Sequence, residues 1–117
     1  MGMAKKLLVA SAVSGLLVSN ISANDDLVKK GEKIFNTNTQ GNCIACHAIE
    51  GKTLDGPGSF GPKFSGLAYW PDEELYKVIY NPYETRNKIS AMPAFGKSGW
   101  LSEEEIKAVI AYLKTIN

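Results

Sequence analysis

The 117-residue chain contains only two cysteines and one histidine. A structural zinc site takes about four ligands, mostly cysteine and histidine, so a zinc ion would have to recruit carboxylates here. Two cysteines can form no more than one disulfide, which excludes a dense disulfide framework. The three residues nevertheless lie together in the segment Cys43-Ile44-Ala45-Cys46-His47. Any chemistry that they perform is therefore concentrated in one short stretch.

A strong charge excess and a long apolar run are also missing. With 13 Lys and Arg against 12 Asp and Glu, the chain has no basic stripe of the kind that binds nucleic acid and no polybasic cluster that favours a lipid surface. The apolar run from Leu7 to Val18 covers about a dozen residues, well short of the roughly 20 that cross a bilayer. No internal repeat or low-complexity linker divides the chain, so a single small domain is predicted.

Residues 1–23 are predicted to be a secretory signal peptide. Lys5 and Lys6 supply its positive n-region, and small residues precede a cleavage point after Ala23. The alternative is an uncleaved membrane anchor. Cleavage would leave 94 of the 117 residues (24–117), with 11 basic and 12 acidic side chains and a net charge of −1. We therefore expect export to the periplasm without stable membrane insertion, and a hydrophobic core that is marginal unaided.

The segment from Cys43 to His47 is C-x-x-C-H, the attachment signature of a c-type haem. Cys43 and Cys46 are spaced on a helical turn so that each can bond to one haem vinyl group, and His47 is then the proximal iron ligand. A thioredoxin-like dithiol is an alternative, but it would sit in a βαβ pattern that the sequence does not show. A single stabilising disulfide is another, although it does not call for the adjacent histidine. The motif predicts one covalently bound haem c.

Met92 is the candidate for the second axial ligand. Met1 and Met3 fall in the predicted signal peptide, so Met92 is the methionine that remains after cleavage. The following Pro93 restricts it to extended backbone, which suits a side chain delivered from a stiff loop. The alternative is a surface or core methionine, with the sixth position left to water, lysine or nothing. Paired with His47, a methionine raises the reduction potential of the haem and occupies the second axial position of the iron. Such a site passes single electrons.

The histidine also needs a partner for its other ring nitrogen. An axial histidine usually donates that N–H to a backbone carbonyl or a carboxylate. The stretch from Glu50 to Gly66 is rich in glycine and proline, which predicts an ordered loop without regular structure. Within it, the Pro62 carbonyl is the candidate support of His47. The alternative is that Pro62 only shapes the turn.

Apolar residues at three-four spacing predict three helices, over Asp25–Asn36, Pro71–Tyr80 and a final stretch that starts with a capping box from Ser102 to Glu105. Asn24 is expected to cap the first of them, and Pro71 to take the first helical position of the second. No strand is convincing, so the fold is predicted to be all-α.

Two tertiary contacts are expected from these helices. Gly31 lies on the apolar face of the first helix, where glycine costs about 1 kcal/mol relative to alanine, so another element should approach it closely. We expect the last helix to cross there, with the ring of Tyr112 on the glycine. Four aromatic residues near the second helix are expected to pack against the macrocycle: Tyr69, Trp70, Tyr76 and Tyr80.

The chain from Asp25 to Asn117 resembles the class I cytochrome c family. The resemblance rests on an N-terminal helix, C-x-x-C-H, a G-P-x-F-x-G loop at Gly61–Gly66, a methionine loop and a C-terminal helix with Ala111-Tyr112-Leu113. It implies a class I cytochrome c domain over residues 24–117, with three main helices and short turns wrapped around one covalently bound haem. It also implies that the carbonyl of the loop proline, here Pro62, holds the haem histidine.

A narrower resemblance is to SoxX, the small monohaem subunit of the SoxAX cytochrome of bacterial thiosulfate oxidation. It rests on Gly41–Ala48, Met92–Gly96 and the later Leu101-Ser102-x-x-x-Ile106. It implies a heterodimer with a SoxA-like cytochrome subunit that acts as an L-cysteine S-thiosulfotransferase on the SoxYZ carrier protein. This chain would pass electrons to a soluble cytochrome c and would supply no catalytic residue, because haem consumes both cysteines. The alternative is a free-standing, diffusible cytochrome c that serves an oxidase or other reductase.

Overall fold

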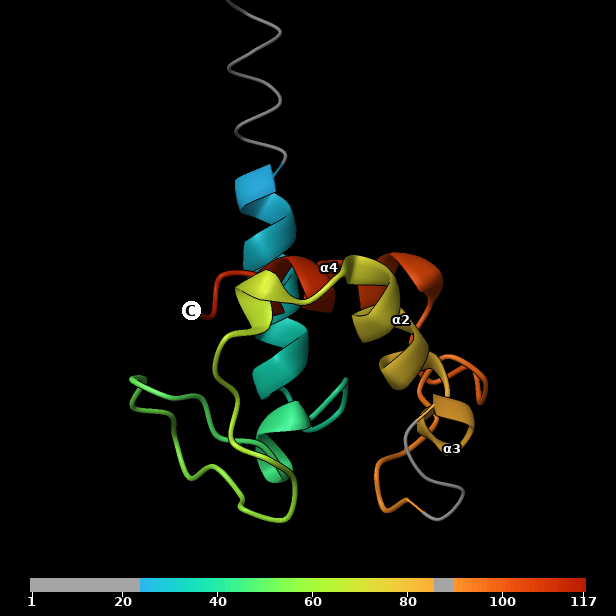
Figure 1. Ribbon diagram of the computed structural model, residues 1–117, viewed down its shortest axis with the longest axis horizontal. Coiled ribbons are helices and arrows are strands. Elements are labelled where there is room, and N and C mark those ends of the chain that lie inside the picture. The colour runs from blue at the N-terminus through green and yellow to red at the C-terminus, as the bar shows by residue number, and fades with distance from the viewer. Residues whose placement is uncertain (1–23, 86–89) are drawn as a thin grey trace, which may run out of the picture.

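The computed structural model describes residues 24–85 and 90–117, so the predicted signal peptide lies outside the described residues. Within these ranges the regular structure is helical, and the one pairing of extended backbone is an isolated bridge between Ile49 and Phe64. The predicted all-α fold is confirmed. In chain order (Figure 1) the elements are a helix over 24–36, the 3-10 turns η1 (Cys43–Ala45) and η2 (Leu67–Tyr69), and the helices α2 (Asp72–Tyr80), α3 (Pro82–Thr85) and α4 (Glu103–Leu113).

Helix α4 begins with the capping box that the sequence predicts. The Ser102 hydroxyl accepts a hydrogen bond from the Glu105 amide at 3.2 Å, and the Glu105 carboxylate accepts one from the Ser102 amide at 3.0 Å. These bonds satisfy amides that have no partner within the first turn of a helix. The predicted apolar face of α4 is buried, and its members are Ile106, Val109, Ile110 and Leu113.

The 24–36 helix crosses α4 in close contact at Gly31 (Figure 1). A Cβ atom on Gly31 would lie 1.9 Å from the carbonyl oxygen of Ala108 and 3.0 Å from the Cβ of Tyr112. The predicted close approach is present, and Tyr112 takes part in it through its Cβ; the expected position of the Tyr112 ring on the glycine stays a prediction. The ring meets the edge of Phe35, with centroids 5.5 Å apart and planes at 62°. The two helices are so close that the backbone of Ala108 fills the space at Gly31.

Gly31→Ala is expected to lower the free energy of unfolding by about 1–3 kcal/mol, the usual cost of overpacking a filled core. Helix propensity alone predicts the opposite sign, because alanine in a helix interior is about 1 kcal/mol more favourable than glycine. Denaturant unfolding followed by circular dichroism measures the sign. Glu32→Ala, which changes an exposed neighbour on the same helix, should stay within about 0.5 kcal/mol of the original chain. Stabilisation by Gly31→Ala would contradict the close crossing.

The predicted start of α2 is displaced by one residue, and one short helix was not predicted. Asn24 is itself helical and is not a cap, while Pro71 has extended backbone and precedes the first residue of α2. Asn81 ends α2 as expected, with φ at −154°. Pro82 then begins α3, because the fixed φ of proline suits the first position of a helix and its missing N–H has no partner to lose there.

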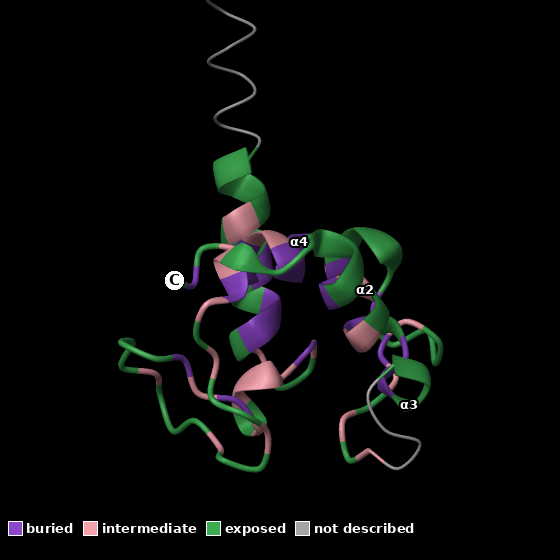
Figure 2. Cartoon of the chain, in the orientation of Figure 1, coloured by how far each residue is buried: buried purple, intermediate pink, exposed green. Residues whose placement is uncertain are grey.

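Figure 2 shows the buried residues gathered where the 24–36 helix, α2 and α4 meet, with the connecting loops more exposed. Leu75 and Ile79 bring α2 into this core. The C-terminal residues close it from one end, where the Ala68 amide of η2 donates to the Ile116 carbonyl at 2.8 Å. Across the described residues, no helix combines the length and the apolar character that a membrane crossing requires.

Candidate functional site

The helices and loops line a partly open cavity of about 1070 Å³, just above the roughly 300–1,000 Å³ of most ligand pockets. Its walls come from segments far apart in the sequence, and they include the apolar side chains of Phe35, Leu67, Ile79 and Val109. The structure brings the five predicted site residues together on these walls: Cys43, Cys46, His47, Pro62 and Met92.

The C-x-x-C-H motif is built on one tight turn. η1 covers Cys43–Ala45, and the His47 amide donates to the Cys43 carbonyl at 2.9 Å. The turn starts at Asn42, whose φ of 50° is left-handed, a conformation that asparagine tolerates better than most residues. The amides of Gly41 and Asn42 donate to the carbonyl of buried Ile34 at 3.1 and 3.2 Å. The motif is therefore anchored on the end of the 24–36 helix.

Both cysteines are free and half-buried. Burial raises the pKa of the Cys43 thiol to about 12; a hydrogen bond to its own backbone opposes this rise, and the neighbouring Cys46 adds to it. Cys43 is therefore a neutral thiol at physiological pH. A reactive dithiol of thioredoxin type has a lowered pKa, so the direction found here disfavours that alternative. Over 24–85 and 90–117, no three Cys, His, Asp or Glu side chains gather as a metal-ion site, which leaves the zinc alternative without a ligand set in these ranges.

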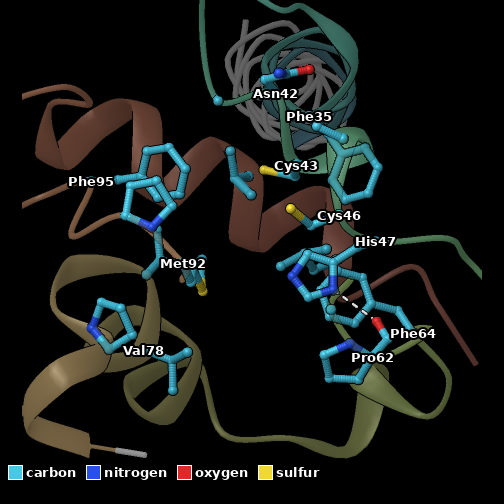
Figure 3. Close-up of a pocket in the computed structure, with 18 of the residues that line it drawn as sticks. Phe35, Asn42, Cys43, Cys46, His47, Pro62, Phe64, Val78, Met92 and Phe95 are labelled. Carbon is cyan, nitrogen blue, oxygen red and sulfur yellow. Dashed lines mark hydrogen bonds between the residues drawn. The ribbon is translucent and has the colours of Figure 1, made fainter. Parts of the chain in front are cut away.

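His47 is buried and is held by the segment that follows it. Its Nδ1 lies 2.7 Å from the Pro62 carbonyl oxygen (dashed in Figure 3). A carbonyl can only accept, so Nδ1 carries the proton and Nε2 keeps its lone pair. The ring stacks on Phe64, with centroids 4.2 Å apart and planes at 16°. A Cβ on Gly61 would lie 2.5 Å from the ring Cε1. The imidazole is thus fixed in its tautomer and in its orientation.

Met92 lies across the cavity from His47. Figure 3 shows the Nε2 edge of the His47 ring and the thioether of Met92 turned toward each other, with the thiols of Cys43 and Cys46 beside the space between them. Met92 belongs to the segment between α3 and α4 and packs, half-buried, against the core. Its amide donates to the Ser90 hydroxyl at 3.1 Å. A nitrogen lone pair and a sulfur lone pair therefore face one space from opposite sides.

This set of donors fits a haem c. A flat apolar macrocycle suits the apolar walls, two neutral thiols stand where vinyl groups can meet them, and one donor is available for each face of the iron. A lysine is the alternative to Met92 as the sixth ligand of the iron. In the described lining of the cavity, the one charged side chain is Lys63. It follows Pro62 on the His47 side, is exposed, and pairs with Glu50 at 3.5 Å, so it does not compete with Met92 for the opposite face.

The four aromatic residues expected against the macrocycle separate in the structure. Trp70 lines the cavity. Tyr69 is 84% exposed, while Tyr76 and Tyr80 stack on each other with centroids 6.0 Å apart and planes at 14°. The prediction is wrong for the three tyrosines. On α2 the reason is that the cavity-facing side carries Val78 and Ile79, so Tyr76 and Tyr80 point elsewhere. Tyr69 is not part of α2 and lies at the end of η2.

Trp100 is a site residue that the sequence reasoning missed. It lines the cavity although it is 61% exposed, and its Nε1–H donates to the backbone carbonyl of Gln40. This bond joins the end of the methionine segment to the loop that precedes the cysteines. The available signal was the residue type, because tryptophan combines a large apolar ring with an N–H donor, which suits the edge of an apolar cavity.

An all-helical domain in which two thiols, an imidazole and a thioether surround one apolar cavity has the fold and the site of a class I c-type cytochrome. The sequence model of the family described as "Cytochrome C oxidase, cbb3-type, subunit III" matches residues 26–113, which is most of the chain, and the protein belongs to this family. Its cofactor is one covalently bound haem c, and the two cysteines supply the attachment motif.

Three curated proteins illustrate the relationship. Cytochrome c oxidase subunit 2 of Alkalihalophilus pseudofirmus is 31% identical, over 89% of this chain and 30% of its own length. An uncharacterized lipoprotein of Aquifex aeolicus is 36% identical, over 63% of this chain and 36% of its own length. Cytochrome c2 iso-1 of Magnetospirillum molischianum is 42% identical, over 63% of this chain and 89% of its own length. The chain thus spans about a third of the first two relatives.

Proposed function

We propose that this chain is a single-electron carrier in which Cys43 and Cys46 hold the haem by thioether bonds and His47 and Met92 are the axial ligands. The observation that carries the proposal is the placement of Nε2 of His47 and the thioether of Met92 on opposite sides of one cavity. With both axial positions filled by the protein, no substrate can bind at the metal. When bound, haem c supplies an iron that gains and loses one electron.

The surrounding residues have two tasks in this proposal. The Pro62 carbonyl accepts a hydrogen bond from the Nδ1–H of His47 and so keeps Nε2 available as a ligand. Phe64 and Gly61 fix the plane of the ring, which reduces the rearrangement that a change of charge would cause. The apolar walls keep water away from the centre, and a low local dielectric favours the less charged, reduced state.

A redox titration of the holoprotein tests this function. We expect one wave with a slope of one electron, and ferrous protein that does not take up carbon monoxide while it is folded. Rapid carbon monoxide binding would show an open axial position, and the chain would then be suited to ligand binding at the iron, contrary to the proposal.

We also propose, as a finer assignment, that the chain is the SoxX subunit of a periplasmic SoxAX complex. The motifs Gly41–Ala48 and Met92–Gly96 support it. In this assignment both cysteines are used for haem, so the group that handles sulfur belongs to a SoxA-like partner and the substrate is carried by SoxYZ. The competing assignment is a free diffusible carrier or an oxidase-linked domain, which the names of the relatives cytochrome c2 iso-1 and cytochrome c oxidase subunit 2 favour.

The native size of the haem-staining species separates the two assignments. Periplasmic extract of cells grown on thiosulfate would be fractionated at low salt. Co-migration with a second, larger cytochrome is expected for SoxX. A lone species near the mass of the single chain would overturn the SoxX assignment and leave the diffusible carrier.

A further inference from the structure

The segment that carries Met92 rests on helix α2 at Gly96. A Cβ atom on Gly96 would lie 2.1 Å from Cδ2 of the Tyr80 ring and 2.8 Å from its Cε2 and Cγ. The next amide, of Lys97, donates to the Tyr80 carbonyl at 3.0 Å. Real Cβ contacts are not this short, so the segment can lie on the ring only because residue 96 is glycine.

We propose that the contact between Tyr80 and Gly96 positions Met92 for the iron, an inference that rests on the proposed His47 and Met92 ligation. Gly96 lies four residues after Met92, inside a turn that is held by two backbone hydrogen bonds. The Ser98 amide donates to the Ala94 carbonyl at 2.9 Å, and the Leu101 amide donates to the Phe95 carbonyl at 3.0 Å. This turn begins at Ala94, two residues after Met92, so a shift of the turn at Gly96 reaches Met92 through the short connection at Pro93.

The surface that supports Gly96 is itself fixed. Tyr80 is the last residue of α2, and it stacks on Tyr76 one turn earlier, with planes at 14°. Leu75 and Ile79 hold the same helix in the core. Tyr80 is 42% exposed and is not among the residues that line the cavity. It therefore acts through Gly96 and is a positioning residue.

The test compares Gly96→Ala, Tyr80→Ala and the double variant in the holoprotein, with haem staining to confirm that each carries covalent haem. The ferric absorption band of thioether ligation and the affinity for imidazole, which competes with methionine at the iron, are measured. For Gly96→Ala we expect a weakened band and an imidazole affinity raised about tenfold, which corresponds to about 1.4 kcal/mol. Tyr80→Ala alone should raise the affinity less, because it removes a support without adding a clash.

The double variant is the decisive comparison. If the added Cβ acts by striking the ring, removing the ring relieves the clash, and the double variant should match Tyr80→Ala. Effects that simply add would overturn the proposal, because independent sites are additive and coupled ones are not. If Gly96→Ala does not fold, Tyr80→Ala decides alone. An unchanged imidazole affinity in Tyr80→Ala would then overturn the proposal.

Gly31→Ala is the matched control. Its Cβ is equally crowded, at 1.9 Å from the Ala108 carbonyl oxygen, but it lies at the crossing of the 24–36 helix with α4. It should lower stability and leave the thioether band unchanged. Absence of the band in the original chain would refute the ligation by Met92 itself. A band present in the original chain and unchanged in Gly96→Ala, with an unchanged imidazole affinity, would refute only the role of Tyr80 and Gly96.

Discussion

Replacing both Cys43 and Cys46 by serine is expected to release the haem to acidified organic solvent and to abolish haem staining after denaturing electrophoresis. Each thiol adds its S–H across a vinyl group, and a serine hydroxyl does not form that bond under the same conditions. Both thiols lie on the cavity wall, where the vinyl groups of a bound haem would meet them. Loss of both thioethers would leave the proposed axial ligands, His47 and Met92, as the remaining attachments, and denaturation removes both.

The same double variant is expected to lose much of its helical structure. The cavity of about 1070 Å³ is lined by side chains that also form the core, among them Phe35, Ile79 and Val109. A domain of this size has a marginal core when nothing fills its centre, so far-ultraviolet circular dichroism should fall together with haem content. Ala45→Ser is the control, because it adds a hydroxyl to an exposed position of the same motif and leaves the thiols in place. Haem that survives extraction from the double serine variant would disprove thioether attachment.

The parts of the site that the sequence predicted depend on local chemistry. Cys43, Cys46 and His47 lie within one turn, so their spacing in the chain determines their spacing in space. The capping box at Ser102 is local for the same reason. Met92 could be chosen from composition alone, because few other strong iron ligands remain in the chain.

The parts that the sequence did not predict depend on how elements far apart in the chain meet. The ring of Tyr112 packs against Phe35 of the 24–36 helix, a contact between two helices that the spacing within either helix does not reveal. Tyr80 was expected against the macrocycle, but it supports Gly96 instead. Trp100 reaches the Gln40 carbonyl across 60 residues of sequence. Propensity and periodicity describe which face is apolar, and they leave open which partner covers it.

Met92→Ala is expected to remove the red-region band of ferric thioether ligation and to lower the midpoint potential, while the haem stays covalently attached. Axial ligands set haem potentials over a range of about 0.8 V, and methionine stabilises the reduced iron. A fall on the order of 100 mV is therefore the scale to expect. Spectroelectrochemistry of the holoprotein measures the band and the potential in one sample, and carbon monoxide binding to the ferrous protein reports the position that opens.

Two further variants separate ligation from packing, since Met92 is also half-buried against the core. Met92→Leu keeps most of the volume and removes the sulfur, so it should change the band and the potential as much as Met92→Ala does. Val78→Ala trims another cavity wall that offers no donor, and it should leave the band in place. An unchanged spectrum in both Met92 variants would remove Met92 from the iron. If only Met92→Ala changes it, packing is the cause and the sixth ligand lies elsewhere. Equal effects of the two Met92 variants, with Val78→Ala unaffected, require the sulfur itself, and then the opposed donors across the cavity are what make this chain a carrier of single electrons.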